Sequence, residues 1–326
     1  MKAIPLVLCA LGVWLLLPAN AAGCSESARL LRYACSFDVR DDFHETSAVC
    51  HDNSVPDSEC FDAAAEERGE GIDECNEVFD ARLELCDALE DAVHEPEFGP
   101  EFAGNFVNPL LIGNGVAPNP YLPLVQGNQW VYEGTFLDDD GEMVTETITV
   151  TVTDKTKLID GITCLVVNDT AEEDEQVIES TDDWFAQDVD GNVWYCGEIS
   201  GEFETFDGDD PETPELVETE GSWKAGRDGA KAGILLPRVP TPGDIIRQEV
   251  AFGDAEDAVE IVSTSASESA PAASCSGNCL QTRDFTPLEP DANEHKYYAP
   301  GIGLIVEIDL DTGERVELIQ APGGGS

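Results

Sequence analysis

Residues 24–86 read CSESARLLRYACSFDVRDDFHETSAVCHDNSVPDSECFDAAAEERGEGIDECNEVFDARLELC and contain six cysteines. The cysteines form three pairs placed symmetrically about residue 55, namely Cys24 with Cys86, Cys35 with Cys75, and Cys50 with Cys60. On a helix, side chains eleven residues apart return to within about 20° of one another, and a fifteen-residue step adds about 60°. Each arm therefore carries its cysteines along one stripe. The symmetry predicts two antiparallel helices cross-linked by three nested disulfides.

Six cysteines allow 15 different sets of disulfide pairings. The common symmetry favours one of them. A zinc site is the rival interpretation, but thiolate zinc ligands usually come as close CxxC pairs, which are absent here. Disulfides are therefore the preferred interpretation.

The N-terminus predicts export. Lys2 is followed by an apolar run over 4–17 and then by Ala19-Asn20-Ala21, the pattern of a signal peptide that spans residues 1–21. We expect a periplasmic or extracellular protein, since disulfides persist in such compartments. Acylation of Cys24 is the less favoured alternative, because it would leave Cys86 without a partner. No later stretch has the 18 apolar residues that a membrane span needs.

The composition is strongly acidic, with 68 Asp and Glu against 16 Lys and Arg and a formal net charge of −52. Nucleic acid is excluded as a direct partner, because phosphate binding needs basic side chains. The acids are spread along the whole chain, which favours adaptation to a saline habitat over a dedicated calcium or polycation binder. A hydrophobic content of 42% indicates a folded protein.

The remaining chain divides into further segments. After the hairpin at 22–95, residues 96–120 are rich in Pro, Gly and Asn and are expected to be a linker. Residues 121–320 are expected to form an antiparallel β domain, and 321–326 a flexible tail. The clearest strand is 145–153, where threonines alternate with Ile148, Val150 and Val152.

The fold class expected is α+β, with the helical hairpin followed by an antiparallel β-meander that forms a curved sheet or a barrel; a two-sheet sandwich is the alternative. Short Asp-Gly turns separate the expected strands. Further strands are expected at 129–137, 162–168, 176–180, 184–188, 192–199, 245–251, 258–263, 280–285, 296–299, 302–309 and 314–319. The acidic stretch 207–220 and the Ser/Ala-rich stretch 263–276 are expected to be loops.

Several short sequence motifs in the expected β domain resemble those of other proteins. They are YLPL at 121–124, GNQWVY at 127–132, DWFAQD at 183–188, GNVWY at 191–195 and EHKYYAPGIGL at 294–304. Together they resemble an uncharacterised family of exported bacterial proteins over about residues 119–320. The resemblance implies export and a β fold, and it implies no catalytic residues.

Candidate catalytic residues are few. His295 is the one histidine in the expected β domain, and a general base at His295 with Tyr297 on the same strand face is conceivable. Glu294, Lys296 and Tyr298 would lie on the opposite face. Asp183, beside Trp184, is the best local carboxylate candidate. The competing interpretation in each case is an ordinary strand with exposed charges.

Weakly bound calcium is the one cofactor that the sequence suggests. Asp188, Asp190 and Asn192 have the first spacings of an EF-hand loop, but Val193 and Ile199 stand where glycine and the closing glutamate belong. A hairpin turn is the favoured interpretation.

Four cysteines remain in the β domain. Cys275 and Cys279 are expected to form a local bridge, which leaves Cys164 to pair with Cys196. A bond from Cys164 to the 275–279 loop is the main alternative.

Aromatic residues are the strongest indication of function in the sequence. Trp184, Trp194, Tyr195 and Tyr298 are candidates to line a barrel cavity and bind a ligand. The leading hypothesis is therefore a non-catalytic binding or surface-interaction protein for a small or extended ligand or another exported protein. The alternatives are an extracellular hydrolase, which a pocket of buried acids would favour, and a structural protein of an envelope or assembly.

Overall fold

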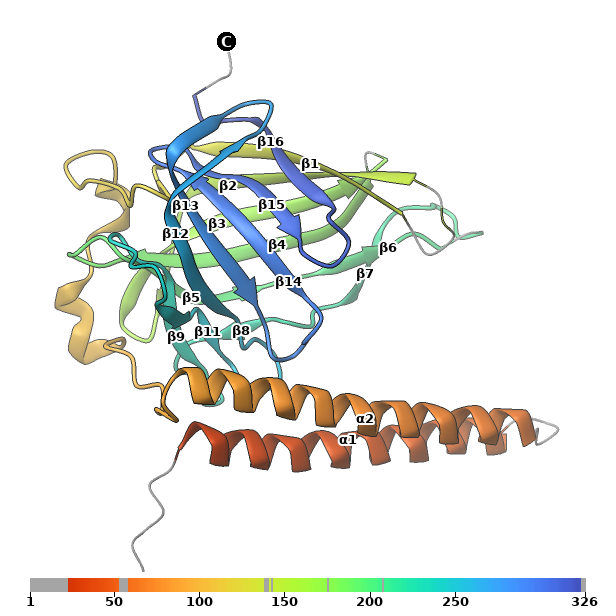
Figure 1. Cartoon of the computed structure of the whole chain (residues 1–326). Helices are drawn as coiled ribbons and strands as arrows, with labels where there is room; N and C mark the ends of the chain where they lie inside the picture. Colours follow the sequence, from red (N-terminus) through yellow and green to blue (C-terminus); the bar gives the residue numbers. More distant parts are fainter. Residues whose placement is uncertain are drawn as a thin grey trace, which may run out of the picture.

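The computed structural model describes residues 23–52, 58–137, 141, 143–174, 176–206 and 208–323. The expected signal peptide at 1–21, the tip of the hairpin and the end of the expected tail lie outside these residues. Two helices, α1 (Cys24–Asp52) and α2 (Ser58–Ala88), lie side by side below a barrel-like sheet (Figure 1). The α+β class is as predicted. None of the described helices is long and apolar enough to cross a membrane.

The hairpin is held by three disulfides at the pairs that the symmetry predicts. Their Cα atoms are 5.4 Å apart in Cys24–Cys86, 5.9 Å in Cys35–Cys75 and 5.8 Å in Cys50–Cys60. The helices also approach closely at Gly71, where a Cβ would lie 3.1 Å from the Val39 side chain. Crosslinks replace most of the apolar seam that two helices of this length would otherwise need, since only a few hairpin residues are buried.

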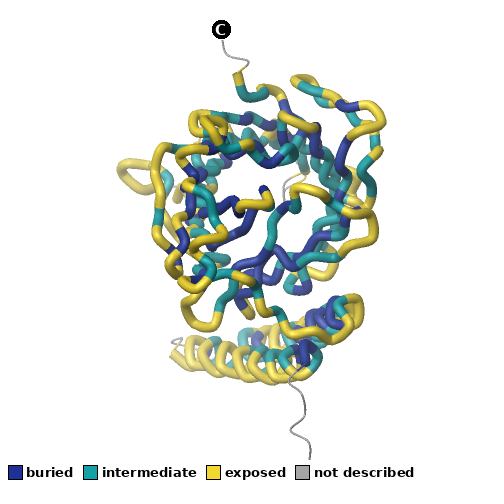
Figure 2. Tube along the Cα trace, turned by 90° about the vertical axis from the view of Figure 1, so that its left-hand side faces the viewer, coloured by how far each residue is buried: buried dark blue, intermediate teal, exposed yellow. Residues whose placement is uncertain are grey.

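The described β residues form one antiparallel sheet of sixteen strands. The strands are β1 (Gln129–Leu137), β2 (Met143–Ile159), β3 (Ile162–Glu173), β4 (Gln176–Gln187), β5 (Val193–Ile199), β6 (Glu202–Glu204), β7 (Glu215–Glu218), β8 (Trp223–Lys224), β9 (Lys231–Leu236), β10 (Ile245–Arg247), β11 (Glu249–Val250), β12 (Ala258–Ser269), β13 (Ser274–Phe285), β14 (Asn293–Ala299), β15 (Gly303–Asp309) and β16 (Arg315–Gln320). The main path runs β10-β12-β13-β14-β15-β16-β1-β2-β3-β4-β5-β9-β11, with β6, β7 and β8 attached beside β4 and β5. Seen from its end, the sheet curls into a ring (Figure 2).

The ring is closed by the chain itself. The two ends of the sheet are β10 and β11, which are consecutive in sequence and separated only by Gln248. The Gln248 side chain donates to the Leu235 carbonyl of β9 (3.0 Å). Gly233 of β9 lies against this junction so tightly that a Cβ there would be 2.3 Å from the Arg247 carbonyl oxygen. A glycine is therefore required for β9 to meet the β10–β11 junction.

The base of the hairpin docks on this closing junction. Arg82 of α2 forms a buried bidentate ion pair with Glu256, at 2.9 Å and 2.5 Å, just before β12. The backbone N–H of Gly253 donates to the same carboxylate (3.0 Å). Arg247, at the end of β10, donates to the Cys24 sulfur (3.0 Å). The outermost disulfide and a buried ion pair thus hold the hairpin against the strands that close the ring.

The segment after the hairpin is packed on the barrel. Lys231 donates to the His94 carbonyl (2.6 Å), and Phe98 and Phe106 stack around Trp194 on the outside of β5. Two short 3₁₀ helices, η1 (Pro100–Asn105) and η2 (Pro109–Leu111), follow. The expected linker at 96–120 therefore has an ordered path against the β domain.

One end of the barrel is covered by residues 117–125. Asn119 is fully buried and donates to the carbonyls of Gly191 (2.9 Å) and Leu236 (3.3 Å). Its side-chain oxygen accepts from the backbone of Tyr121 and Leu122. This segment carries Leu122 and Leu124 into the barrel and closes that end.

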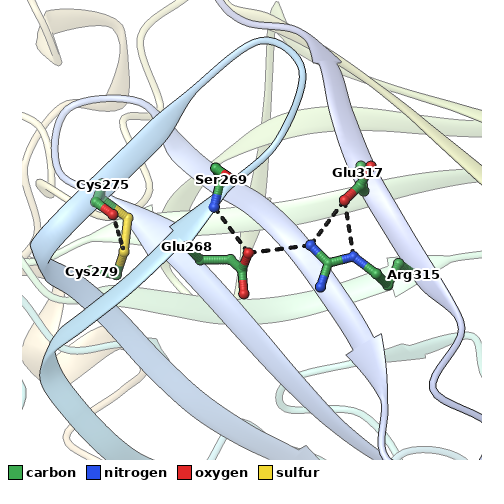
Figure 3. A network of polar contacts seen from close by, with 6 residues as sticks. All are labelled: Glu268, Ser269, Cys275, Cys279, Arg315 and Glu317. Atoms are coloured by element: carbon green, nitrogen blue, oxygen red, sulfur yellow. Dashed lines mark hydrogen bonds and ion pairs between the residues drawn. A yellow bond between two sulfur atoms is a disulfide. The ribbon is translucent and has the colours of Figure 1, made fainter.

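The Ser/Ala-rich stretch 263–276 is mostly strand, so the loop expected there is wrong. β12 and β13 extend beyond the sheet as a hairpin whose Ala272 N–H donates to the Leu318 carbonyl of β16 (2.9 Å). Glu268 binds Arg315, which also binds Glu317, and the Cys275–Cys279 disulfide lies on the next strand (Figure 3). Small side chains allow the two strands to bend, and these contacts fix the bent hairpin on its neighbour. The acidic stretch 207–220 likewise contains the short strand β7.

The Arg82–Glu256 pair gives a test of hairpin docking. Arg82→Met leaves the Glu256 carboxylate buried without its cation and should lower the free energy of unfolding by ~3–5 kcal/mol. The double variant Arg82→Met/Glu256→Gln removes both charges and should recover most of that loss. Urea denaturation followed by tryptophan fluorescence measures both. The exposed pair Glu26–Arg29 is the control, and Arg29→Met should have no measurable effect. Equal stability of Arg82→Met and the unaltered protein would contradict docking through this pair.

Candidate functional site

The barrel interior holds three adjoining cavities of about 490, 220 and 280 Å³. They share walls, because Asp183, Glu198 and Lys296 each line two of them. The described residues contribute eleven carboxyl side chains to the lining: Glu146, Asp169, Glu179, Asp183, Glu198, Glu249, Asp257, Asp284, Glu289, Glu294 and Glu307. Among the described residues that line them, Lys296 is the only base. The interior therefore carries a large excess of acid.

The acids are not distributed evenly along the barrel. On β3 the lining residues change from Val167 to Asp169, and on β4 from Phe185 to Asp183. On β15 they change from Leu304 near the covered end to Glu307. The cavity that contacts Leu122 and Leu124 is mainly apolar, whereas the other two are mainly polar and contain most of the acids. The interior thus has an apolar closed end and an acidic opposite end.

Asp183 and Glu198 form a carboxyl pair around one phenol. The Tyr195 hydroxyl contacts both carboxyl groups within hydrogen-bond distance. A phenol has one proton to donate, so the second contact requires a proton on one of the two carboxyl groups. Burial, followed by the charge of Glu198, raises the pKa of Asp183 well above its usual value, and burial likewise raises that of Glu198. Both shifts favour a proton held between the two groups, as in other closely spaced buried carboxyl pairs.

A second pair lies where the ring closes. Glu249 of β11 is buried, and burial and the neighbouring Asp257 raise its pKa well above its usual value. The pKa of Asp257 is raised mainly by its own burial. A side-chain contact with the Trp223 indole lowers the pKa of Glu249 and offsets part of the effect of burial. A buried acid of this kind costs free energy unless its charge is compensated.

Asp169 is an interior acid with a raised pKa. Burial, with the like charges of Glu179 and Glu146, raises its pKa to about 7. Asp169 therefore changes its charge in the physiological range.

Lys296 is paired with three carboxyl groups of the barrel. Its ammonium lies 3.1 Å from Glu294, 3.2 Å from Glu307 and 4.0 Å from Asp284. Burial would lower the pKa of Lys296, but the three carboxyl groups together raise it well above its usual value. The lysine thus stays charged and compensates these neighbours, which leaves the carboxyl groups of β3, β4, β5 and β11 without a base.

The structure separates the aromatic candidates into two groups. Tyr195 and Tyr298 line the cavities beside Asp183. Trp184 instead stacks with Lys157, whose ammonium is 3.3 Å from the ring centroid, and with Lys224. Trp194 contacts Phe98 and Phe106 and lines a different cavity beside the hairpin. Neither tryptophan lines the acidic cavities.

His295 and Tyr297 are also away from the cavities. Glu294, Lys296 and Tyr298 line the interior, so His295 and Tyr297 lie on the outer face of β14, as strand alternation predicts. The His295 ring contacts the Gln281 side chain (3.3 Å). The structure therefore does not bring His295 together with Asp183.

The calcium candidates form a turn. The Asp188 carboxylate accepts four hydrogen bonds, from the backbone of Gly191 and Asn192, the Asn192 side chain and the Trp194 indole, at 2.7–2.9 Å. Asp190 is exposed at the tip. Within the described residues, no group of three or more His, Cys, Asp or Glu side chains is arranged to hold a metal ion.

The remaining cysteines pair as expected, in Cys164–Cys196 and Cys275–Cys279. Cys164 and Cys196 connect β3 to β5 across β4, the strand that carries Asp183. The crosslink therefore stabilises the part of the barrel that holds the Asp183–Glu198 pair.

Most interior acids were not identified from the sequence. Asp169, Glu198, Glu249 and Asp257 are dispersed over four segments, and nothing in their local pattern distinguishes them from the other acids of the chain. Asp169 is the exception, because it lies two residues after Val167, at the end of the apolar run 165–167, and therefore shares the strand face of Val167.

No family model, curated protein or solved structure matches this chain.

The pKa of Asp169 predicts an unusual pH dependence of stability. Because folding raises the pKa of Asp169, the folded state binds this proton more tightly than the unfolded state does. The contribution of Asp169 to stability is therefore fully present below about pH 4 and is lost as the pH rises to about 7. Asp169→Asn should reduce this slope by up to ~1.4 kcal/mol per pH unit, the value for one proton. Urea denaturation between pH 4 and 8 measures it.

The control for net charge is Glu66→Gln on the exposed surface of α2, which removes one charge outside the barrel. Its pH profile should match that of the unaltered protein. If Asp169→Asn and Glu66→Gln changed the profile equally, the effect would come from total charge and the assignment to the interior would be wrong.

Proposed function

We propose that the chain is an exported binding protein whose barrel interior holds an organic cation. The observation that carries this proposal is the imbalance of eleven carboxyl groups and one base among the described residues that line one interior. A second observation supports it, since that base, Lys296, already pairs with three of these acids. A bound ammonium or guanidinium group would supply both the charge and the donors.

The structure favours an organic cation over a metal ion. The carboxyl groups are distributed over many strands, and no three of the described metal-binding side chains converge on one point. A metal ion needs such convergence, with ligands at fixed short distances. An organic cation is larger and can use donors that point to separate walls of a cavity.

The compartment forms part of the proposal. Five disulfides indicate a non-cytoplasmic protein. The Cys24 sulfur is bonded to Cys86, so acylation would require loss of the outer bridge. This supports an unacylated protein of the periplasm or the extracellular medium.

A hydrolase is the second candidate, and the Asp183–Glu198 pair favours it, because paired buried carboxyl groups with raised pKa values are typical of acid–base sites. The Tyr195 hydroxyl, however, occupies the position between the two groups that an attacking water would need. We therefore place binding first.

A structural or assembly role is the third candidate, and β7 opposes it. This edge strand is only four residues long and carries Glu215 and Glu218. Short, charged edges disfavour pairing with another chain.

The proposal predicts selective binding of cations. Titration calorimetry at pH 8 should detect one site for butylammonium and none for butyrate, which carries the opposite charge on a similar chain. Asp169→Asn and Asp183→Asn should each weaken butylammonium binding by about tenfold or more, the loss expected for one charged hydrogen bond.

Glu66→Gln is the matched control for general attraction to an acidic protein, and it should leave binding unchanged. Equal weakening by Glu66→Gln would assign the binding to the surface. Failure to detect any organic cation would overturn the proposed function. Hydrolysis of a substrate that is abolished by Asp183→Asn would favour the second candidate.

A further inference from the structure

We infer that the organic cation is an amphipathic monoamine, whose apolar tail lies at the covered end of the barrel and whose ammonium lies among the carboxyl groups of β3 and β4. This inference rests on the proposed function, because it names the class of cation that the same interior takes. It follows from the order in which apolar and acidic residues line the barrel.

The covered end presents apolar surface to the cavity even where its residues have polar tips. The Trp130 indole N–H donates to the Ile302 carbonyl (2.7 Å), and the Tyr132 hydroxyl donates to the Leu304 carbonyl (3.2 Å). Both tips donate to the barrel wall, so the two rings have no N–H or O–H left to donate to a ligand. Leu124 lines the same cavity from the covering segment. This end can therefore stabilise a ligand only by burial of apolar surface.

The first charged groups beyond this surface are Asp169 and Asp183, which line the same cavity of about 220 Å³. Asp169 is surrounded by other acids, namely Glu146, Glu179 and Glu307. Lys296 also lines this cavity, but three other carboxyl groups bind it. An ammonium bound at this level would compensate the charge of Asp169 and Asp183, which Lys296 does not pair with.

Other ligand classes fit this order less well. A fatty acid would place its carboxylate among carboxylates, where like charges repel at short range. A polyamine would place a second ammonium against the apolar end, away from Asp169, Asp183 and Glu307, the carboxyl groups of the described residues that line this cavity. A neutral alcohol would leave the charge of Asp169 and Asp183 uncompensated. One charged head on one apolar tail matches both halves of the cavity.

The test is a series of n-alkylammonium chlorides, from propyl- to heptylammonium, titrated into the full chain at pH 8, where Asp169 is mainly ionised. Affinity should rise about fourfold for each added methylene until the apolar cavity is filled, the value for burial of one CH₂ group. Heptanol and heptanoate should bind at least tenfold more weakly than heptylammonium. Asp169→Asn should weaken every amine of the series by a similar factor.

The apolar end is tested with a matched pair of variants at Leu304, which lines the cavity and is half-buried. Leu304→Met preserves apolar volume and should retain the dependence on chain length. Leu304→Gln adds a polar group and should reduce the gain per methylene while propylammonium binding stays near its original value. If Leu304→Gln fails to fold, as urea denaturation would reveal, the alkyl series on Leu304→Met and the unaltered protein still decides the question.

The outcomes separate this inference from the proposed function. Amines that bind through Asp169 with no dependence on chain length would refute the amphipathic class and leave cation binding intact. Tighter binding of a diamine than of the monoamine of equal length would do the same. If no amine binds, or if heptanol binds as tightly as heptylammonium, both the inference and the proposed function are wrong.

Discussion

The structure depends on the enclosure of carboxyl groups in a barrel whose described lining residues include one base, Lys296, to compensate them. Water stabilises charged acids far better than a protein interior does, so enclosure raises the pKa values of Asp183, Glu249 and Asp169. A folded chain retains such an arrangement at a cost in stability. Shared protons, as in the Asp183–Glu198 pair, reduce that cost, and a bound cation would reduce it further.

The same constraint connects the hairpin to the site. Glu249 and Asp257 lie at the junction where the ring closes, and the backbone N–H groups of Gln248 and Glu249 both donate to the Asp257 carbonyl. The Arg82–Glu256 ion pair lies next to this junction. Three disulfides make the hairpin a rigid arm, and its base holds the strands that carry two of the interior acids. The crosslinked helices therefore contribute to the site by position, although no residue of α1 or α2 lines it.

Much of the fold was predictable from local patterns. The symmetry of six cysteines predicted the hairpin and its pairings, and strand alternation at 294–298 predicted which side chains of β14 share a face. β9 was missed because KAGILL is short and lacks alternation, and its role depends on Gly233, whose value appears only when Arg247 approaches it. The strands at 263–276 were missed because serine and alanine have little preference for a sheet, and contacts with β16 decide their conformation.

The site was less predictable than the fold, for a physical reason. In a chain with 68 acids, alternation assigns each acid to one of two strand faces but does not reveal which face becomes the interior. That is fixed by long-range closure through Gln248. Asp183 was singled out because it stands beside Trp184, yet Trp184 points away from the cavity and Tyr195 is the aromatic partner of Asp183.

Burial inside the barrel and the neighbouring acids raise the pKa of Asp169 to about 7. A ¹³C NMR titration of the Asp and Glu side-chain carboxyl groups tests this consequence of enclosure most directly. The structure predicts one signal that titrates near pH 7 and is absent in the Asp169→Asn variant. A titration in which every carboxyl group ionises below pH 5 would contradict the account.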